Sequence, residues 1–169
     1  TISAVSKKID SNFEGNLFKD FDFIVDCTDN FDTRSMINKI SLLNKIPLIS
    51  GAAIRFEGQV ATFRNDIDGM PCYRCLYPNL PNVSSSCIDS GILGSVTGFV
   101  GTMVATECIK LICHIGDNLE SKLLLIDLKH NEWLLKKNNM IFLDGNQNFR
   151  DEKDIFNEYL EQIKSILEE

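Results

Sequence analysis

The chain has 169 residues, of which 44% are hydrophobic and 24% are charged. This balance fits one folded domain with an apolar core and excludes a disordered or fibrous chain. The 24 acidic and 17 basic residues give a formal net charge of -7, and no cluster of Lys and Arg is long enough to follow a phosphate backbone. Nucleic acid is therefore excluded as an expected partner.

The longest apolar stretch, residues 91–115, contains hydroxyl side chains, several glycines and the charged Glu107 and Lys110. It therefore falls short of an uncharged bilayer span, and we expect a buried helix and no membrane partner. The first residues lack both the apolar core of a signal peptide and an initiator Met. We expect a cytoplasmic protein and a chain that is a fragment of a longer one.

The first half of the chain predicts a strand, a helix and a second strand. The strand covers about residues 22–27, and the second strand covers residues 46–53. Between them, residues 32–44 carry apolar side chains at helical spacing, at Met36, Ile37, Ile40 and Leu43. Arg34, Lys39 and Asn44 are expected to point away from this apolar face. The three elements form a βαβ unit, which predicts a parallel pair of strands.

The second half predicts antiparallel strands and two further helices. Residues 56–64 alternate as a strand, and the connection from Ala53 is too short for a crossover helix, so this strand should pair antiparallel. A long loop at 65–90 is expected to be functional or mobile, and a helix at 91–113 follows it. Residues 122–127 and 132–136 predict a hairpin, with a short strand at 140–143. An amphipathic helix at 151–167 is expected to dock on the domain or on a partner. The whole chain, residues 1–169, is thus predicted as one α/β domain with a Rossmann-like sheet.

The turn D-C-T-D-N at residues 26–30 stands between the first strand and the helix. Ligands of open α/β sheets collect beyond the carboxyl ends of strands, so Asp29 is placed where a nucleotide or its metal can be reached. The alternative is that Asp29 or Asn30 only caps the helix.

Six cysteines occur, and Cys72 and Cys75 form a C-x-x-C pair. Two thiolates at this spacing can bind one zinc, but a structural zinc needs four ligands. An ancestral remnant and a redox pair are the alternatives. A redox C-x-x-C is expected at the start of a helix that follows a strand, whereas this pair falls in the middle of the predicted loop.

Cys87 precedes the helix at 91–113 and follows three serines. A thiol beside a helix N-terminus can have its thiolate favoured by the amides there, which makes Cys87 the best candidate nucleophile. The alternative is an inert cysteine in a loop. Cys27, Cys108 and Cys113 are expected to be core residues.

Several motifs in order resemble the ThiF/MoeB/HesA family, the bacterial relatives of the ubiquitin-activating enzymes. They are D-C-T-D-N at 26–30, T-R-x-x-I-N at 33–38, S-G-A-A-I-R-x-E-G-Q at 50–59, P-C-Y-R-C at 71–75 and the segment around Cys87, S-C-I-D-S-G-I-L-G. The resemblance covers roughly residues 20–115, and more loosely extends to 136. One of these motifs alone would be unspecific, but the ordered combination is specific.

The resemblance implies adenylation: ATP and Mg²⁺ activate the C-terminal Gly-Gly carboxylate of a ubiquitin-like sulfur-carrier protein and pyrophosphate is released. Asp29 resembles the aspartate that holds Mg²⁺ and the phosphates, with Asn30 and Arg34 beside it in the nucleotide half-site. Residues Ser50, Gly51 and Ala52 resemble the strand end that receives the carrier's tail. Cys72 and Cys75 resemble one half of the family's zinc site, and Cys87 resembles the thiol that in some members takes up the carrier or its sulfur. Family members are commonly homodimers.

The chain departs from the family pattern in two places. The family's glycine-rich phosphate loop precedes D-C-T-D-N, and only about 25 residues precede that motif here. We therefore expect a C-terminal part of an adenylyltransferase domain that is inactive alone. The second C-x-x-C is expected near residues 138–142, where N-N-M-I-F stands, which weakens the zinc hypothesis.

The leading hypothesis is thus an adenylyltransferase of thiamin or molybdopterin sulfur transfer, and the sequence does not distinguish these carriers. A non-catalytic module that binds a ubiquitin-like protein is the main alternative. A C-x-x-C redox or zinc protein is the third.

Overall fold

The structure is a computed structural model that describes residues 1–10, 13, 15–78 and 91–137. A 3₁₀ helix, η1 (Gly15–Phe18), precedes β1 (Ile24–Asp26), α1 (Phe31–Asn44) and β2 (Leu48–Ile54). These are followed by β3 (Glu57–Phe63), the short helix α2 (Tyr73–Leu76), α4 (Gly94–Cys113), β4 (Lys122–Asp127) and β5 (Glu132–Lys137). The predicted strand at 140–143, the predicted helix at 151–167 and Cys87 lie outside the described residues.

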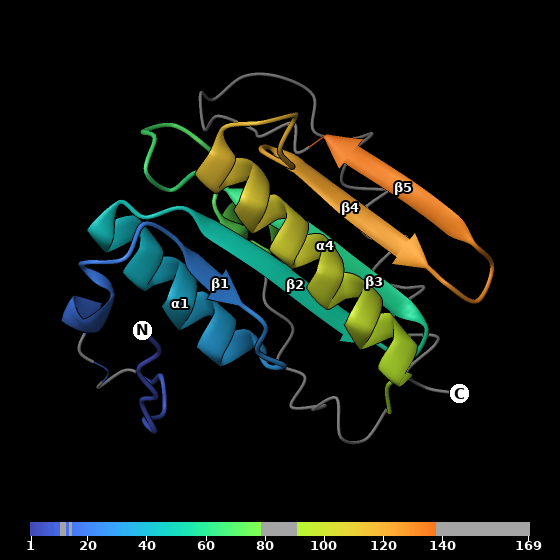
Figure 1. Cartoon of the computed structure of the whole chain (residues 1–169), viewed down its shortest axis with the longest axis horizontal. Helices are drawn as coiled ribbons and strands as arrows, with labels where there is room; N and C mark the ends of the chain where they lie inside the picture. Colours follow the sequence, from blue (N-terminus) through green and yellow to red (C-terminus); the bar gives the residue numbers. More distant parts are fainter. Residues whose placement is uncertain (11–12, 14, 79–90, 138–169) are drawn as a thin grey trace.

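The described strands form one five-stranded sheet in the order β1-β2-β3-β4-β5 (Figure 1). β1 and β2 are parallel, with Asp26 opposite Ser50, whereas the other neighbours are antiparallel. The predicted βαβ unit, the antiparallel third strand and the hairpin are therefore confirmed. The fold is α/β, as the sequence predicted.

Two apolar cores lie on opposite faces of the sheet, because successive side chains of a strand point to opposite sides. α1 and α2 cover one face, where Ile37 and Ile40 pack against Leu48 and Phe63. α4 covers the other face and runs alongside β2 and β3 (Figure 1). The predicted apolar stripe of α1 holds for Ile37 and Ile40.

Two residues of α1 are not where the sequence placed them. Leu43 is 75% exposed, whereas Arg34, expected to point away from the apolar face, is 5% exposed. Arg34 lies three and seven positions before Ile37 and Ser41, so all three share one face of the helix. A buried charge needs partners, and Arg34 has them in the neighbouring strands.

α4 contacts the sheet through a narrow stripe. Its buried residues are Val96, Val100, Val104 and Glu107. Gly51 of β2 and Gly58 of β3 permit this close approach, because a Cβ at either glycine would stand 2.6 Å or 2.5 Å from a valine methyl of α4. The expectation of a buried helix is therefore wrong for its outer face, where Ile109 and Ile112 are more than half exposed.

Among the described residues, α4 is also the one helix that is long and apolar enough to cross a membrane by length and composition alone, with a mean hydropathy of 1.5. The expectation that its polar residues would leave it short of a bilayer span is thus corrected.

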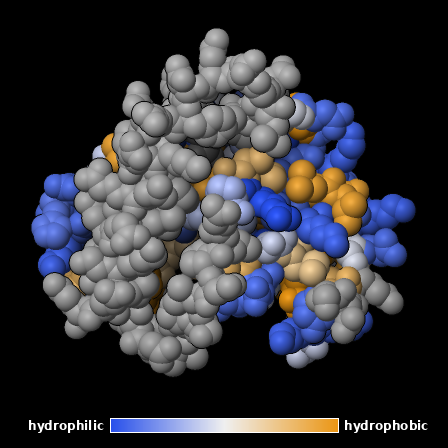
Figure 2. All heavy atoms as spheres, turned by 180° about the vertical axis from the view of Figure 1, so that it is seen from behind, coloured by the Kyte–Doolittle hydropathy of each residue, from blue (hydrophilic) through white to orange (hydrophobic). Residues whose placement is uncertain are grey.

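The surface on the side turned away in Figure 1 is mixed: apolar and polar residues lie next to each other on its described part (Figure 2).

Candidate functional site

The turn after β1 is held by the side chain of Asp26. This carboxylate is 1% exposed and accepts hydrogen bonds from the backbone N–H of Thr28 at 2.9 Å and from its hydroxyl at 2.7 Å. An Asp that bonds the backbone two residues ahead forms a local turn in place of a continued strand. β1 therefore ends at Asp26, and the chain turns toward α1.

Arg34 ties this turn to β2. Its guanidinium donates to the hydroxyl of Ser50 and to the carbonyl of Gly51, both at 2.9 Å, and to the carbonyl of Thr28. It also forms an ion pair with Asp26 at 3.5 Å. Because the planar guanidinium presents several donors in fixed directions, one side chain can hold three segments in register. In this arrangement Arg34 contacts protein groups, and the predicted contact with a nucleotide stays a prediction.

Asn30 is the N-cap of α1, and its side chain accepts a hydrogen bond from the N–H of Thr33 at 2.8 Å. The capping alternative is therefore confirmed for Asn30, although capping does not test its predicted role beside a nucleotide. Asp29, one residue earlier, is exposed, and the Asn30 amide lies 3.4 Å from its carboxylate. Asp29 thus stands at the carboxyl end of β1 and beside the N-terminus of α1.

An exposed carboxylate in this place fits Mg²⁺, because proteins hold that ion through one or two carboxylates together with substrate phosphates and water. Within the described residues no group of three or more potential ligands gathers around one point. Asp29 can therefore supply one ligand of an ion that a nucleotide also holds.

The predicted carrier-tail residues lie inside β2 and not at its end, because the strand continues to Ile54. Ser50 is buried on the α1 side, where Arg34 contacts it, and Gly51 lies against Val104 of α4. Ala52 is half-buried. The resemblance placed these three residues at the end of a strand. The structure corrects this expectation and places them in the middle of β2.

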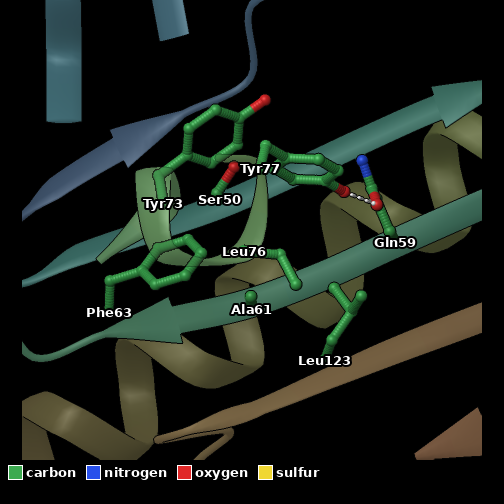
Figure 3. A pocket seen from close by; sticks show the side chains of 8 residues that line it. All are labelled: Ser50, Gln59, Ala61, Phe63, Tyr73, Leu76, Tyr77 and Leu123. Atoms are coloured by element: carbon green, nitrogen blue, oxygen red, sulfur yellow. Dashed lines mark hydrogen bonds between the residues drawn. The ribbon is translucent and has the colours of Figure 1, made fainter. Parts of the chain in front are cut away.

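A pocket lies over the same part of β2 and β3, under the rings of Tyr73 of α2 and of Tyr77, which follows α2 (Figure 3). It opens to solvent, with an empty space of about 180 Å³ that includes part of this open solvent, and is lined by Ser50, Gln59, Ala61, Phe63, Tyr73, Leu76, Tyr77 and Leu123. The Tyr77 hydroxyl donates to Gln59 Oε1 at 2.6 Å, whereas the buried Tyr73 hydroxyl has no hydrogen-bond partner among the described residues.

Burial dominates the ionisation of both rings. It raises the pKa of Tyr77 to about 12 and raises the pKa of Tyr73 further, with the neighbouring Tyr77 adding to the effect at Tyr73. Both hydroxyls therefore stay protonated at neutral pH and act as hydrogen-bonding groups.

Cys72 and Cys75 lie at the start of α2, with Cys72 as its N-cap and the two Sγ atoms 3.6 Å apart. The expectation that the pair lies in the middle of a loop is therefore wrong. A zinc site does not fit the described residues, because these two thiols are only half of a tetrahedral ligand set and no third ligand gathers near them in the described ranges.

The remaining described cysteines divide between surface and core. Cys108 is half-buried and packs on the core under α4, as expected. Cys27 and Cys113 are exposed, against expectation. Cys27 follows β1, whose one described neighbour is β2, so its side chain is not enclosed by a strand on the other side. Partial burial and the nearby Asp26 carboxylate nevertheless raise the pKa of the Cys27 thiol.

Sequence reasoning missed the parts played by Asp26, Thr28, Tyr73 and Tyr77. The signal for the first two was present, because an Asp followed two positions later by Thr is typical of a side-chain-closed turn. Nothing in the local sequence showed that two tyrosines of the predicted loop would enter the core.

With this geometry established, comparison with known proteins identifies the family. Residues 1–140 match the ThiF family. The chain belongs to the ThiF family. Relatives of this ThiF-family chain include "Adenylyltransferase and sulfurtransferase MOCS3" of Caenorhabditis briggsae, 42% identical over 70% of this chain and 30% of the relative. "Adenylyltransferase and sulfurtransferase uba4" of Emericella nidulans is 43% identical over 63% of this chain and 24% of the relative.

The solved structure of the microcin C7 biosynthetic enzyme MccB in complex with N-formylated MccA has the same fold, with a TM-score of 0.64. It is 15% identical and covers 80% of this chain and 44% of MccB. This ThiF-family chain therefore spans about a quarter to a third of the length of the curated relatives it matches.

Proposed function

We propose that this chain forms part of an adenylyltransferase, in which ATP and Mg²⁺ activate the C-terminal carboxylate of a ubiquitin-like sulfur-carrier protein. The supporting observation is the cluster of Asp26, Arg34 and Ser50, which holds the turn so that Asp29 is exposed beside the N-terminus of α1. Relatives over this same segment are adenylyltransferases and sulfurtransferases.

In the proposed reaction a carboxylate oxygen of the carrier attacks the α-phosphorus of ATP, and pyrophosphate leaves. Mg²⁺ would neutralise part of the phosphate charge, with Asp29 as a protein ligand. The N-terminus of α1 favours the phosphate oxygens through its unpaired amides and its dipole. Asn30 stabilises that helix end. Arg34 is a positioning residue, because it holds the carbonyls of Thr28 and Gly51 from inside the fold.

The carrier's tail is proposed to pass along the β2 segment that contains Ser50, Gly51 and Ala52. Cys87, outside the described residues, is proposed to form the covalent adduct with the carrier or its sulfur. The chain is further proposed to work in the cytoplasm as a homodimer. Its own 169 residues contain no G-x-G-G-x-G phosphate loop. We therefore propose that exchange requires a polypeptide that also carries this loop.

The experiment is carrier-dependent exchange of pyrophosphate into ATP, measured on this chain and on a polypeptide that includes the loop, with carriers of thiamin and of molybdopterin synthesis. Asp29→Asn should lower exchange by about 100-fold or more, since it removes a metal ligand. Asp32→Asn is the matched control: Asp32 is an exposed carboxylate in the first turn of the same helix, and its loss should change exchange less than about threefold.

Equal effects of the two substitutions on exchange would mean that the Asp29 carboxylate acts only by its charge at the N-terminus of α1, and not as a metal ligand. No exchange from the loop-containing protein with either carrier would support the alternative, a non-catalytic module that binds a ubiquitin-like protein. Cys87→Ser should leave exchange intact and abolish a covalent carrier adduct, and an adduct that survives this change would assign the nucleophile elsewhere.

A further inference from the structure

Cys72 and Cys75 are a pair of thiols for which the proposed adenylation has no use. Their Sγ atoms lie 3.6 Å apart, and the Cys75 N–H donates to the Cys72 carbonyl at 3.0 Å, which closes the turn between them. Cys72 is half-buried and Cys75 is exposed. Both sulfurs thus lie on one side of a short helix start that a small molecule can reach.

The ligand set for a metal is incomplete around this pair. The other described cysteines lie on β1's turn and on α4, and no third Cys, His, Asp or Glu gathers with the pair within the described ranges. The segment at 138–142, N-N-M-I-F, contains no ligand side chain for zinc. Cys87 lies outside the described residues, and the sequence carries no second C-x-x-C pair after Cys75 to complete a structural zinc site.

We propose that Cys72 and Cys75 form a reversible disulfide, so that in this chain the C-x-x-C motif is a redox-active dithiol and not half of a zinc site. An S–S bond is about 2.05 Å long, so the sulfurs must approach each other by about 1.5 Å. The spacing of the two cysteines, C-x-x-C, is the one found in dithiol redox motifs. The inference is independent of the proposed adenylation.

The reaction needs an oxidant, and a low-molecular-weight disulfide such as glutathione disulfide is sufficient. The thiolate of one cysteine attacks a sulfur of the small disulfide, which gives a mixed disulfide and one released thiol. The second cysteine then attacks the protein sulfur of that mixed disulfide and releases a second thiol. Two electrons pass from the protein to the oxidant, and the two S–H protons end on the two small thiols.

We expect this bond to form without unfolding the domain, because α2 is anchored on its other side. The Tyr73 N–H donates to Asn38 Oδ1 of α1 at 3.1 Å, and the Tyr73 ring packs edge to face on Phe63 with centroids 6.0 Å apart. Tyr77, next after α2, is tied to Gln59 (Figure 3). These contacts leave the sulfurs as the groups that move.

The test equilibrates the full chain in glutathione buffers of increasing oxidised-to-reduced ratio, followed by alkylation, intact mass measurement and peptide mapping. The expected product has lost about 2 Da, with Cys72 linked to Cys75 and both protected from alkylation. Cys75→Ser should instead carry one glutathione at Cys72, a gain of about 305 Da. The matched controls Cys27→Ser and Cys113→Ser change exposed cysteines elsewhere and should leave the disulfide unchanged.

Two results would overturn the proposal. The first is measured at an oxidised-to-reduced glutathione ratio at which Cys75→Ser is fully glutathionylated. At this ratio, Cys72 and Cys75 of the unsubstituted chain would both remain open to alkylation, or each would carry its own glutathione. The second is that protein purified without added metal contains about one zinc per chain, and that a thiol-blocking mercurial releases this zinc. In that case the disulfide would form only after the zinc had been removed.

Discussion

Replacement of Arg34 by Met tests whether this side chain holds the site together. Arg34 is 5% exposed and joins Asp26, Thr28, Ser50 and Gly51. Met fills much of the same volume but cannot donate hydrogen bonds or carry charge. The substitution therefore leaves the Asp26 carboxylate, which is 1% exposed, with only the donors of Thr28.

Loss of one partner of a buried ion pair costs about 3–5 kcal/mol, because the remaining charge is left without compensation. We expect the free energy of unfolding to fall by about 4 kcal/mol. With a urea slope of about 2 kcal/mol per M, this loss moves the midpoint down by about 2 M. The single tryptophan, Trp133, lies on β5 and packs edge to face on Phe99 of α4, so its fluorescence reports unfolding away from the substitution.

Lys39→Met is the matched control, because Lys39 is exposed on the same helix and its loss should change stability by less than about 0.5 kcal/mol. The double variant Asp26→Asn with Arg34→Met should be less destabilised than the sum of the two single variants, since no unpaired charge remains. A loss below about 1 kcal/mol for Arg34→Met would refute the reasoning. If exchange activity then disappeared with stability retained, the guanidinium would face the nucleotide.

Two further predictions concern the packing of the sheet and its alkaline stability. Gly51→Ala should destabilise the chain by about 1–3 kcal/mol in urea unfolding, because its Cβ would stand 2.6 Å from a Val104 methyl, and Val104→Ala should restore part of the loss. Gly98→Ala on the open side of α4, where an added Cβ would meet no described atom within 4 Å, should instead stabilise by about 0.5–1 kcal/mol, and equal losses at both glycines would contradict the close-packing argument. The pKa of Tyr77 is raised to about 12, so its contribution to stability is complete below pH 10 and is lost as the pH rises toward 12. Urea midpoints between pH 9 and about 11.5 should therefore fall less steeply in Tyr77→Phe, and identical slopes would show that this hydroxyl stays solvated.

The strands and helices were predictable where periodicity and length are informative. The helix at 31–44, the parallel pair on either side of it and the hairpin of β4 and β5 all follow from local patterns. The short helix α2 was missed, because its four residues are too few to show a helical period. The burial of α4 was overestimated, because a run of apolar residues does not say how many neighbours cover it.

The exposed residues of the candidate site were predictable from the sequence, whereas the buried contacts that hold them in place were not. Asp29 and Asn30 stand in a motif beside a strand end, and the structure places both there. Arg34 was read as outward-facing, because a sequence cannot show that a carboxylate, a hydroxyl and two carbonyls from other segments will surround it. Cys27 was read as a core residue, because its apolar neighbours in sequence conceal its position at the edge of the described sheet.

The sequence by itself determined the family, the order of the elements and the identity of the residues that crowd the turn after β1. These properties depend on motifs and on spacings along the chain, which are local. Tertiary structure alone decided that the buried Arg34 side chain joins the turn after β1 to β2. It also decided that α4 packs closely on Gly51 and Gly58, and that the sulfurs of Cys72 and Cys75 lie 3.6 Å apart. Each of these depends on contacts or backbone geometry that exist only once distant segments have packed, and packing sets which charges are paired, which glycines are required and which thiols can meet.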